Sequence, residues 1–260
     1  VDGLVTADPL NPLRRRGSVS SILEVRGTEP FPDDPEDKIP HGTVHIDTIY
    51  AVALGRAVKC YVYTPPGYQA TARKYPVLYL LHGGSGDPSN WTASGSADIM
   101  ADNFIGRGNM KEMIIVMPHA EFPRTQPYTE EVRKKWLDTF EHHLIEEVMP
   151  FAEKRYRITG TREDRWLAGL SNGGSQTLHV GFRRPDLFSV MAPFSTRLRD
   201  GFEADYPLLQ DAAKFNGDMR LFYFACGEED HNWEGFKTSH AALKKLGIEH
   251  EWVATPGAHN

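Results

Sequence analysis

A serine within a short glycine-rich stretch is the strongest sign of chemistry in the sequence. The stretch reads Gly169-Leu170-Ser171-Asn172-Gly173-Gly174 and matches the pattern G-x-S-x-G. It ends a strand-like run, RWLAGL, and opens a helix-like run, NGGSQTLHVGFRR. A sharp turn from strand to helix exposes the serine hydroxyl and leaves no room for side chains at the flanking positions. The pattern alone occurs by chance in about one chain in ten of this length. The strand before it and the helix after it favour Ser171 as a nucleophile over a glycine-rich helix start.

A serine hydroxyl needs a base to take its proton, usually a histidine oriented by a carboxylate. Four histidines follow Ser171: His231, His240, His250 and His259. His240 lies in a predicted helix and His250 begins a predicted strand. His231 is too close in sequence to the candidate acids to be oriented by them from a separate loop. His259 follows the last predicted strand, at the sheet edge where Ser171 also lies, so elimination favours it as the base.

Three acidic residues follow the strand-like run MRLFYFACG: Glu228, Glu229 and Asp230. Their loop leaves a buried strand on the side of the sheet where Ser171 is expected. Any one of the three can orient the imidazole, and the residues by themselves leave that choice open.

Ester hydrolysis also needs hydrogen-bond donors for the oxyanion. The backbone N–H of Asn172 is one, because it directly follows the nucleophile. The loop HGGSGD, residues 82–87, follows a predicted strand and lets the main chain approach a substrate, and we expect Gly84 to be the second donor. A phosphate-binding loop is the alternative, but the Gly-Lys-Ser/Thr ending is missing. We interpret His82 as a structural residue beneath this loop.

These residues require a sheet with strands and helices in alternation. GTVHIDTIYAVAL and RAVKCYVYTP predict an antiparallel hairpin near the N-terminal side. Short apolar runs such as YPVLYLL and EMIIVMP then alternate with helical segments, which predicts an α/β fold with a mostly parallel central sheet and helices on both faces. Residues 130–156 carry apolar side chains at a spacing of four, and Pro150 should kink or end that helix.

Composition narrows the classes of function. The net charge is −6 without a broad basic stripe, which argues against a nucleic-acid partner. No apolar stretch is long enough to span a membrane. His142 and His143 face different directions on a helix and no metal-binding motif occurs, so we predict no catalytic metal and no cofactor. Cys60 and Cys226 lie in strand-like runs, and the sequence leaves a disulfide between them open. It also leaves the oligomeric state open.

The combined motifs resemble a known family. TPPGY, YPVLYLLHGGSGDPSNW, LAGLSNGGSQT, GEED and PGAHN occur in this order, as in carbohydrate esterase family one of the esterase-D-like superfamily. The resemblance covers about residues 40–260 and implies an α/β-hydrolase fold. It also implies a nucleophile at Ser171, an acid at Asp230, a base at His259 and oxyanion donors at Gly84 and Asn172.

Two departures from the family stand out. Methionine is common after the nucleophile, where this chain has Asn172. Family members also continue past the histidine into a tryptophan-bearing helix, so we expect His259 to be displaced or mobile. VDGLVTADPLNP resembles the end of a starch-binding-type β-sandwich module of family forty-eight. We therefore expect residues 1–40 to be a remnant of that module plus a linker, and residues 41–260 to be the esterase domain.

The resemblance implies removal of feruloyl or acetyl groups from arabinoxylan or xylan by a secreted or periplasmic protein. Trp91 and Trp233 lie in loops near Gly84 and Asp230, where they would stack on a sugar or phenolic ring, or simply be buried. Alternatives are a siderophore trilactone esterase, an acyltransferase to a sugar, and a non-catalytic carbohydrate-binding relative, against which the intact set of serine, aspartate and histidine argues.

Overall fold

A computed structural model describes residues 31–36, 38–122 and 126–259. The expected module remnant therefore lies mostly outside the described residues. Within them, one eight-stranded sheet has the order β1-β2-β4-β3-β5-β6-β7-β8. The strands are β1 Thr43–Ala51, β2 Arg56–Thr64, β3 Val77–Leu81, β4 Ile114–Met117, β5 Arg165–Leu170, β6 Val190–Phe194, β7 Leu221–Gly227 and β8 Glu251–Thr255.

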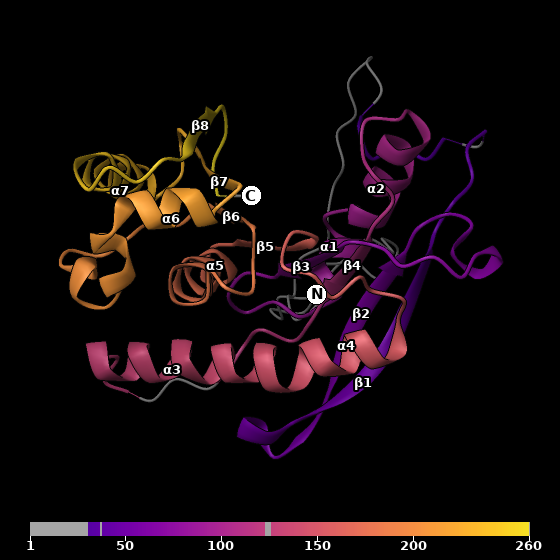
Figure 1. The fold of residues 1–260 in the computed structure, drawn as a ribbon, viewed down its shortest axis with the longest axis horizontal. Coiled ribbons are helices and arrows are strands. Elements are labelled where there is room, and N and C mark those ends of the chain that lie inside the picture. The colour runs from indigo at the N-terminus through magenta and orange to yellow at the C-terminus, as the bar shows by residue number, and fades with distance from the viewer. Residues whose placement is uncertain (1–30, 37, 123–125, 260) are drawn as a thin grey trace, which may run out of the picture.

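The two N-terminal strands form the expected antiparallel hairpin, with Thr43 opposite Thr64 and Ala51 opposite Arg56. Its turn closes at Gly55, whose φ of 60° suits a residue without a side chain. β2 pairs antiparallel with β4, and the strands from β4 to β8 are all parallel. Figure 1 shows the hairpin extending from one side of the molecule. The predicted α/β fold is confirmed.

Helices cover both faces of the sheet. The helices are α1 Asn90–Ala93, α2 Ala97–Gly106, α3 Glu130–His142, α4 Met149–Arg155, α5 Asn172–Arg183, α6 Ala212–Asp218 and α7 Trp233–Lys245. α3, α4 and α5 bury apolar side chains against one face of the strands, and α6 and α7 pack with α5 on that same face around β6 and β7. α2 packs on the other face over β2, β3 and β4. Figure 1 shows α3 and α4 nearly in line along one side.

The helical run that contains Pro150 continues instead of ending. α3 passes into a π-helical turn, His143–Val148, and α4 then begins with Pro150 in its first turn. Proline has no N–H to donate and its ring crowds the carbonyl one turn earlier. A wider π turn directly before Pro150 accommodates both effects without breaking the run.

The segment between β6 and β7 carries structure that the sequence patterns did not predict. It contains two 3₁₀ turns, Phe202–Ala204 and Pro207–Gln210, followed by α6. Phe202 and Leu209 are buried in the apolar cluster that also holds Leu178 and Phe182 of α5. This segment therefore packs on the helix that starts at Ser171.

The described residues contain neither a disulfide nor a membrane-spanning helix. Cys60 and Cys226, both within the described part of the chain, are buried free thiols and form no disulfide. No helix in the described ranges is both long and apolar enough to cross a membrane.

Candidate active site

Ser171 occupies the strained turn that its motif predicts. Its φ of 59° and ψ of −113° join the end of β5 to the start of α5. Its backbone N–H donates a 2.9 Å hydrogen bond to the carbonyl of Phe194, which ties the turn to β6. A Cβ added at Gly169 would lie 2.4 Å from the Gly173 oxygen, and one at Gly173 would lie 2.5 Å from the Leu81 oxygen. The turn therefore requires glycine at both positions.

Asp230 and His259 form a hydrogen-bonded pair at the same edge of the sheet. His259 Nδ1 lies 2.8 Å from Asp230 Oδ2, and the Asp230 side chain is fully buried. Burial by itself would raise the pKa of this carboxyl group. Hydrogen bonds from the backbone N–H of Asn232, at 2.7 Å, and from His259 outweigh burial and hold the pKa below its ordinary value. Asp230 is therefore ionised at neutral pH and able to orient the imidazole.

The loop that carries His259 is tied to the end of β7 by its backbone. Glu228 donates its N–H to the Thr255 carbonyl at 2.8 Å, and Glu229 donates to Gly257 at 2.9 Å. The loop thus holds His259 against Asp230, while the expected displacement of His259 from Ser171 stays a prediction. Among the described residues no hydrogen bond joins the Ser171 hydroxyl to His259. Contacts between nucleophile and base often tighten only when substrate binds.

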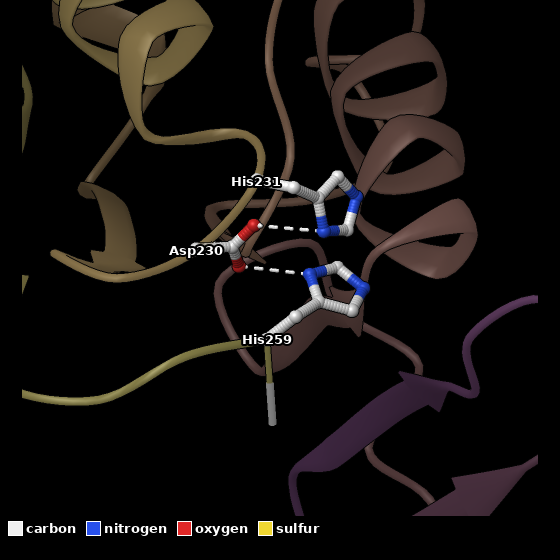
Figure 2. Close-up of side chains that lie close together, drawn as sticks. All are labelled: Asp230, His231 and His259. Atoms are coloured by element: carbon white, nitrogen blue, oxygen red, sulfur yellow. Dashed lines mark hydrogen bonds and ion pairs between the residues drawn. The ribbon is translucent and has the colours of Figure 1, made fainter.

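His231 also contacts this pair, which the sequence argument had excluded. Its Nδ1 lies 3.4 Å from Asp230 Oδ1, and its ring centroid lies 4.3 Å from that of His259. Figure 2 shows one imidazole directed at each oxygen of the carboxylate. Asp230 and His231 are adjacent in the sequence, and the loop bends sharply enough for their side chains to meet. Adjacency was therefore the sequence signal for this contact, not a reason against it.

The side chain of Asn172 lies against Gly84, the other residue expected to supply an oxyanion donor. A Cβ added at Gly84 would be 2.4 Å from the side-chain nitrogen of Asn172, and one at Gly83 would be 3.5 Å from the Cβ of Ser171. The glycine loop thus lies directly over the nucleophile turn. The side chain of Asn172 covers Gly84, so a residue larger than glycine would displace it.

His82 supports this loop from below, as the sequence predicted. It is buried, its Nδ1 lies 2.9 Å from the Gly83 carbonyl oxygen, and its Nε2 accepts the Ala120 N–H at 3.0 Å. The Ala120 carbonyl in turn accepts a 2.7 Å hydrogen bond from Gln176 of α5. Burial lowers the pKa of His82, so the ring is neutral and acts as both donor and acceptor.

A cavity of about 250 Å³ opens beside Ser171 and Asn172. Its walls include Tyr128 and Trp136 together with Phe202 and Tyr206 of the β6–β7 segment. The sequence patterns did not identify these residues as part of a site. Phe202 and Tyr206 reach the cavity because the β6–β7 segment packs on α5.

The two tryptophans singled out in the sequence lie outside this cavity lining. Trp91 packs against the apolar cluster under α2 and closely approaches Gly95. Trp233 packs against Phe236 and Trp252, with ring centroids 5.8 Å apart in both cases. Both side chains are half-buried in these contacts.

Two groups of described residues bring potential metal ligands together. Asp230, His231 and His259 form one, and Asp138, Glu141 and His179 the other. In the first, both imidazoles already face the carboxylate of Asp230. In the second, Arg183 Nε lies 2.8 Å from Glu141 Oε2, so a cationic side chain already neutralises the cluster.

Residues 51–251 match the family model described as putative esterase. This span is most of the chain and includes Ser171 and Asp230. The chain belongs to this esterase family. The resemblance to carbohydrate esterase family one is confirmed by the relatives that follow.

A curated relative of this esterase is the endo-1,4-beta-xylanase/feruloyl esterase of Xylanibacter ruminicola, 29% identical over 224 residues. The match covers 84% of the esterase and 29% of the relative, so the chain spans less than a third of that protein's length. Among solved structures, a CE1 ferulic acid esterase from Anaeromyces mucronatus in complex with ferulic acid is 28% identical, with a TM-score of 0.73. That match covers 92% of this chain and 93% of the other.

The enterobactin esterase of Shigella flexneri is a more distant structural neighbour of the esterase. It is 16% identical, with a TM-score of 0.65, and the match covers 88% of this chain and 57% of the other. At this level of identity the likeness shows the fold alone.

Proposed function

We propose that the chain is a serine esterase that removes feruloyl or acetyl groups from the plant cell-wall polysaccharides arabinoxylan and xylan. The observation that carries the proposal is the strained Ser171 turn beside a cavity, with the hydrogen-bonded Asp230 and His259 at the same sheet edge. The similarity to a xylanase/feruloyl esterase and to a ferulic acid esterase favours the feruloyl group.

Each residue has a defined role in the proposed reaction. The Ser171 hydroxyl attacks the ester carbonyl while His259 takes its proton, and Asp230 keeps the imidazole in the correct tautomer. The N–H groups of Gly84 and Asn172 stabilise the oxyanion. His259 then protonates the departing sugar oxygen, which leaves an acyl group on Ser171. A water molecule, deprotonated by His259, releases the free acid and restores the serine.

The cavity walls support an aromatic acyl group. The cavity lining includes Tyr128, whose side chain is exposed, and the buried aromatic residues Trp136, Phe202 and Tyr206. An aromatic wall next to Ser171 suits a phenolic ring better than an acetyl group. We propose the exposed side chain of Tyr128 for substrate stacking in place of Trp91 and Trp233. The resemblance further supports a secreted or periplasmic location.

Replacing Ser171 by alanine tests the mechanism. We expect kcat for methyl ferulate to fall by at least about a thousandfold, because only binding and oxyanion stabilisation remain. The Ser94→Ala variant changes an exposed serine and should keep wild-type turnover. Turnover of methyl ferulate by the folded Ser171→Ala variant at the wild-type rate would refute the assignment.

Substrate choice is tested with a panel of methyl ferulate, acetylated xylan and a siderophore trilactone. We expect kcat/KM to be highest for the ferulate ester. Cleavage of the trilactone but not of the ferulate would favour a siderophore esterase, and the absence of an acyl-enzyme burst on every substrate would favour a non-catalytic carbohydrate-binding protein.

A further inference from the structure

Three arginines line the cavity beside Ser171, although the whole chain carries a net charge of −6. These are Arg133, Arg197 and Arg199, and none of the described residues that line the cavity is an aspartate or a glutamate. A pocket with one sign of charge and low-dielectric walls attracts ligands of the opposite sign. Simple ferulate and acetate esters of neutral sugars carry no such charge, so this feature is not explained by ester cleavage alone.

Two of the three arginines are neutralised by nearby carboxylates. Arg133 Nε lies 2.7 Å from Glu130 Oε1, and a second nitrogen of Arg133 lies 3.2 Å from Asp205. Arg199 lies 2.6 Å from the other oxygen of Glu130. Both arginines therefore hold the wall of the cavity together, and their charges are largely balanced.

Arg197 differs from these two. It is exposed, and its guanidinium forms no ion pair or side-chain hydrogen bond with any residue in the described ranges. Its stem lies across the first turn of α7, because a Cβ added at Gly235 would be only 2.1 Å from Arg197 Cδ. The adjoining hollow is lined by the acidic residues Glu130, Asp200 and Asp205, of which Glu130 and Asp205 already pair with other arginines. The structure thus holds an uncommitted guanidinium at the cavity that contains Ser171.

We propose that Arg197 binds a carboxylate carried by the substrate close to the ester that Ser171 cleaves. The preferred substrate is then an acidic ester, such as a feruloyl ester on an oligosaccharide that also carries a uronic acid. A planar guanidinium binds a carboxylate through two parallel hydrogen bonds, which gives orientation as well as attraction. This inference rests on the proposed esterase function and adds the charge of its substrate.

Matched esters test the proposal. The first is a feruloyl ester of a neutral oligosaccharide and the second is the same compound with one uronosyl group. The third carries its carboxylate on the acyl group. Comparing it with the second shows whether Arg197 binds a carboxylate on the sugar or on the acyl group. We expect kcat/KM of the wild type to be about fivefold higher for one acidic ester than for the neutral one. Raising the salt from about 0.05 M to about 0.5 M should shrink this preference by screening.

Three variants identify the responsible group. Arg197→Gln should reduce the preference for the acidic ester to about one. Gly235→Ala should also reduce it, because the new methyl group displaces the Arg197 stem without changing any charge. Arg56→Gln removes an exposed arginine from the distant hairpin and should leave the preference intact.

Equal kcat/KM values for the neutral and both acidic esters would overturn the proposal, as would a preference that persists in Arg197→Gln. If no feruloyl ester is cleaved, the proposed function is wrong, and the role of Arg197 is then tested by ligand binding alone. Calorimetry with the Ser171→Ala variant compares the uronosyl oligosaccharide with its neutral counterpart. Equal affinities would overturn the role of Arg197.

Discussion

Backbone strain at single residues concentrates around the candidate site. Ser85, Ser96, Ser171 and Ser195 are the described non-glycine residues with positive φ. Ser85 lies in the glycine loop, Ser171 carries the candidate nucleophile, and Ser195 follows β6, where its carbonyl accepts a 3.0 Å hydrogen bond from Asn232. Such conformations cost about 1–3 kcal/mol each and persist only where the surroundings impose them. At the site, these strained conformations direct side chains away from the orientation that a regular strand would give them.

The choice of Asp230 among three neighbouring acids can be tested at the residue scale. Asp230→Asn should lower kcat by about ten thousandfold, because the amide favours the wrong tautomer of His259. Glu228→Gln and Glu229→Gln change exposed neighbours and should stay within about twofold of the wild type. Steady-state kinetics on a ferulate ester measures all three. A larger loss of kcat in Glu229→Gln than in Asp230→Asn would show that Glu229, not Asp230, is the acid that orients His259.

The pKa of Asp230 also predicts a feature of the pH–rate profile. Because the pKa lies below the ordinary value of about 4, the carboxylate stays ionised throughout the range above it. Its contribution to stability is complete above about pH 4 and is lost as the pH falls through the lower value in the folded protein. We therefore expect kcat between pH 5 and pH 8 to show no step from Asp230. A step in that range that disappears in Asp230→Asn but not in Glu229→Gln would contradict this.

At the scale of elements, the end of β7 and the loop after β8 form one unit. Gly227 ends β7, and a Cβ there would lie 2.2 Å from the Gly257 oxygen. This close approach allows the two backbone hydrogen bonds that place His259 beside Asp230. The alignment of the pair therefore depends on main-chain packing and not only on the two side chains.

Gly227→Ala should separate the loop from β7. We expect kcat to fall by about a hundredfold, the usual result of moving a catalytic group by about 1 Å, with a smaller change in KM. Gly217→Ala is the matched control, because an added Cβ in α6 meets nothing within 4 Å and should be neutral or slightly stabilising. Unchanged kcat in a folded Gly227→Ala protein would show that the loop positions His259 by other contacts.

At the scale of the whole molecule, buried neutral histidines link stability to pH. Burial lowers the pKa of His82 and His143, and burial, together with the unfavourable proximity of the His82 ring when both are protonated, lowers the pKa of His119 to about 4. A base whose pKa falls on folding binds fewer protons in the native state than in the unfolded state. Its contribution to stability is complete above about pH 6.5 and decreases as the pH falls towards the lower pKa of the folded protein.

The free energy of unfolding should therefore decrease by about 1–2 kcal/mol between pH 7 and pH 5, after allowing for the part of His119 that solvent reaches. Urea denaturation at both pH values measures this change. The glutamine side chain of the His119→Gln variant does not titrate, so the free energy of unfolding of this variant should depend less on pH. A free energy of unfolding that is constant or rises on acidification would contradict the prediction.

Much of the architecture followed from local patterns. The apolar runs correctly predicted the hairpin, the parallel strands and most helices, because period and flanking turn residues are local properties. The G-x-S-x-G stretch predicted the strained turn at Ser171 for a steric reason contained in six residues. The HGG loop likewise predicted a structural His82, since the residue beneath a glycine loop has nearby backbone groups to bond.

Only the tertiary structure decided which distant groups meet. Local patterns did not distinguish the three adjacent acids, and only the family resemblance favoured Asp230. In the structure, burial and hydrogen bonds from Asn232 and His259 distinguish Asp230 from its neighbours. His231 proved to share the same carboxylate, and Arg197 proved to line the cavity of Ser171. Periodicity describes which face of its own element a residue occupies, whereas these contacts depend on how the β6–β7 segment, α5 and the loop after β8 pack together. That packing is a long-range property, so it could not be inferred from spacing along the chain.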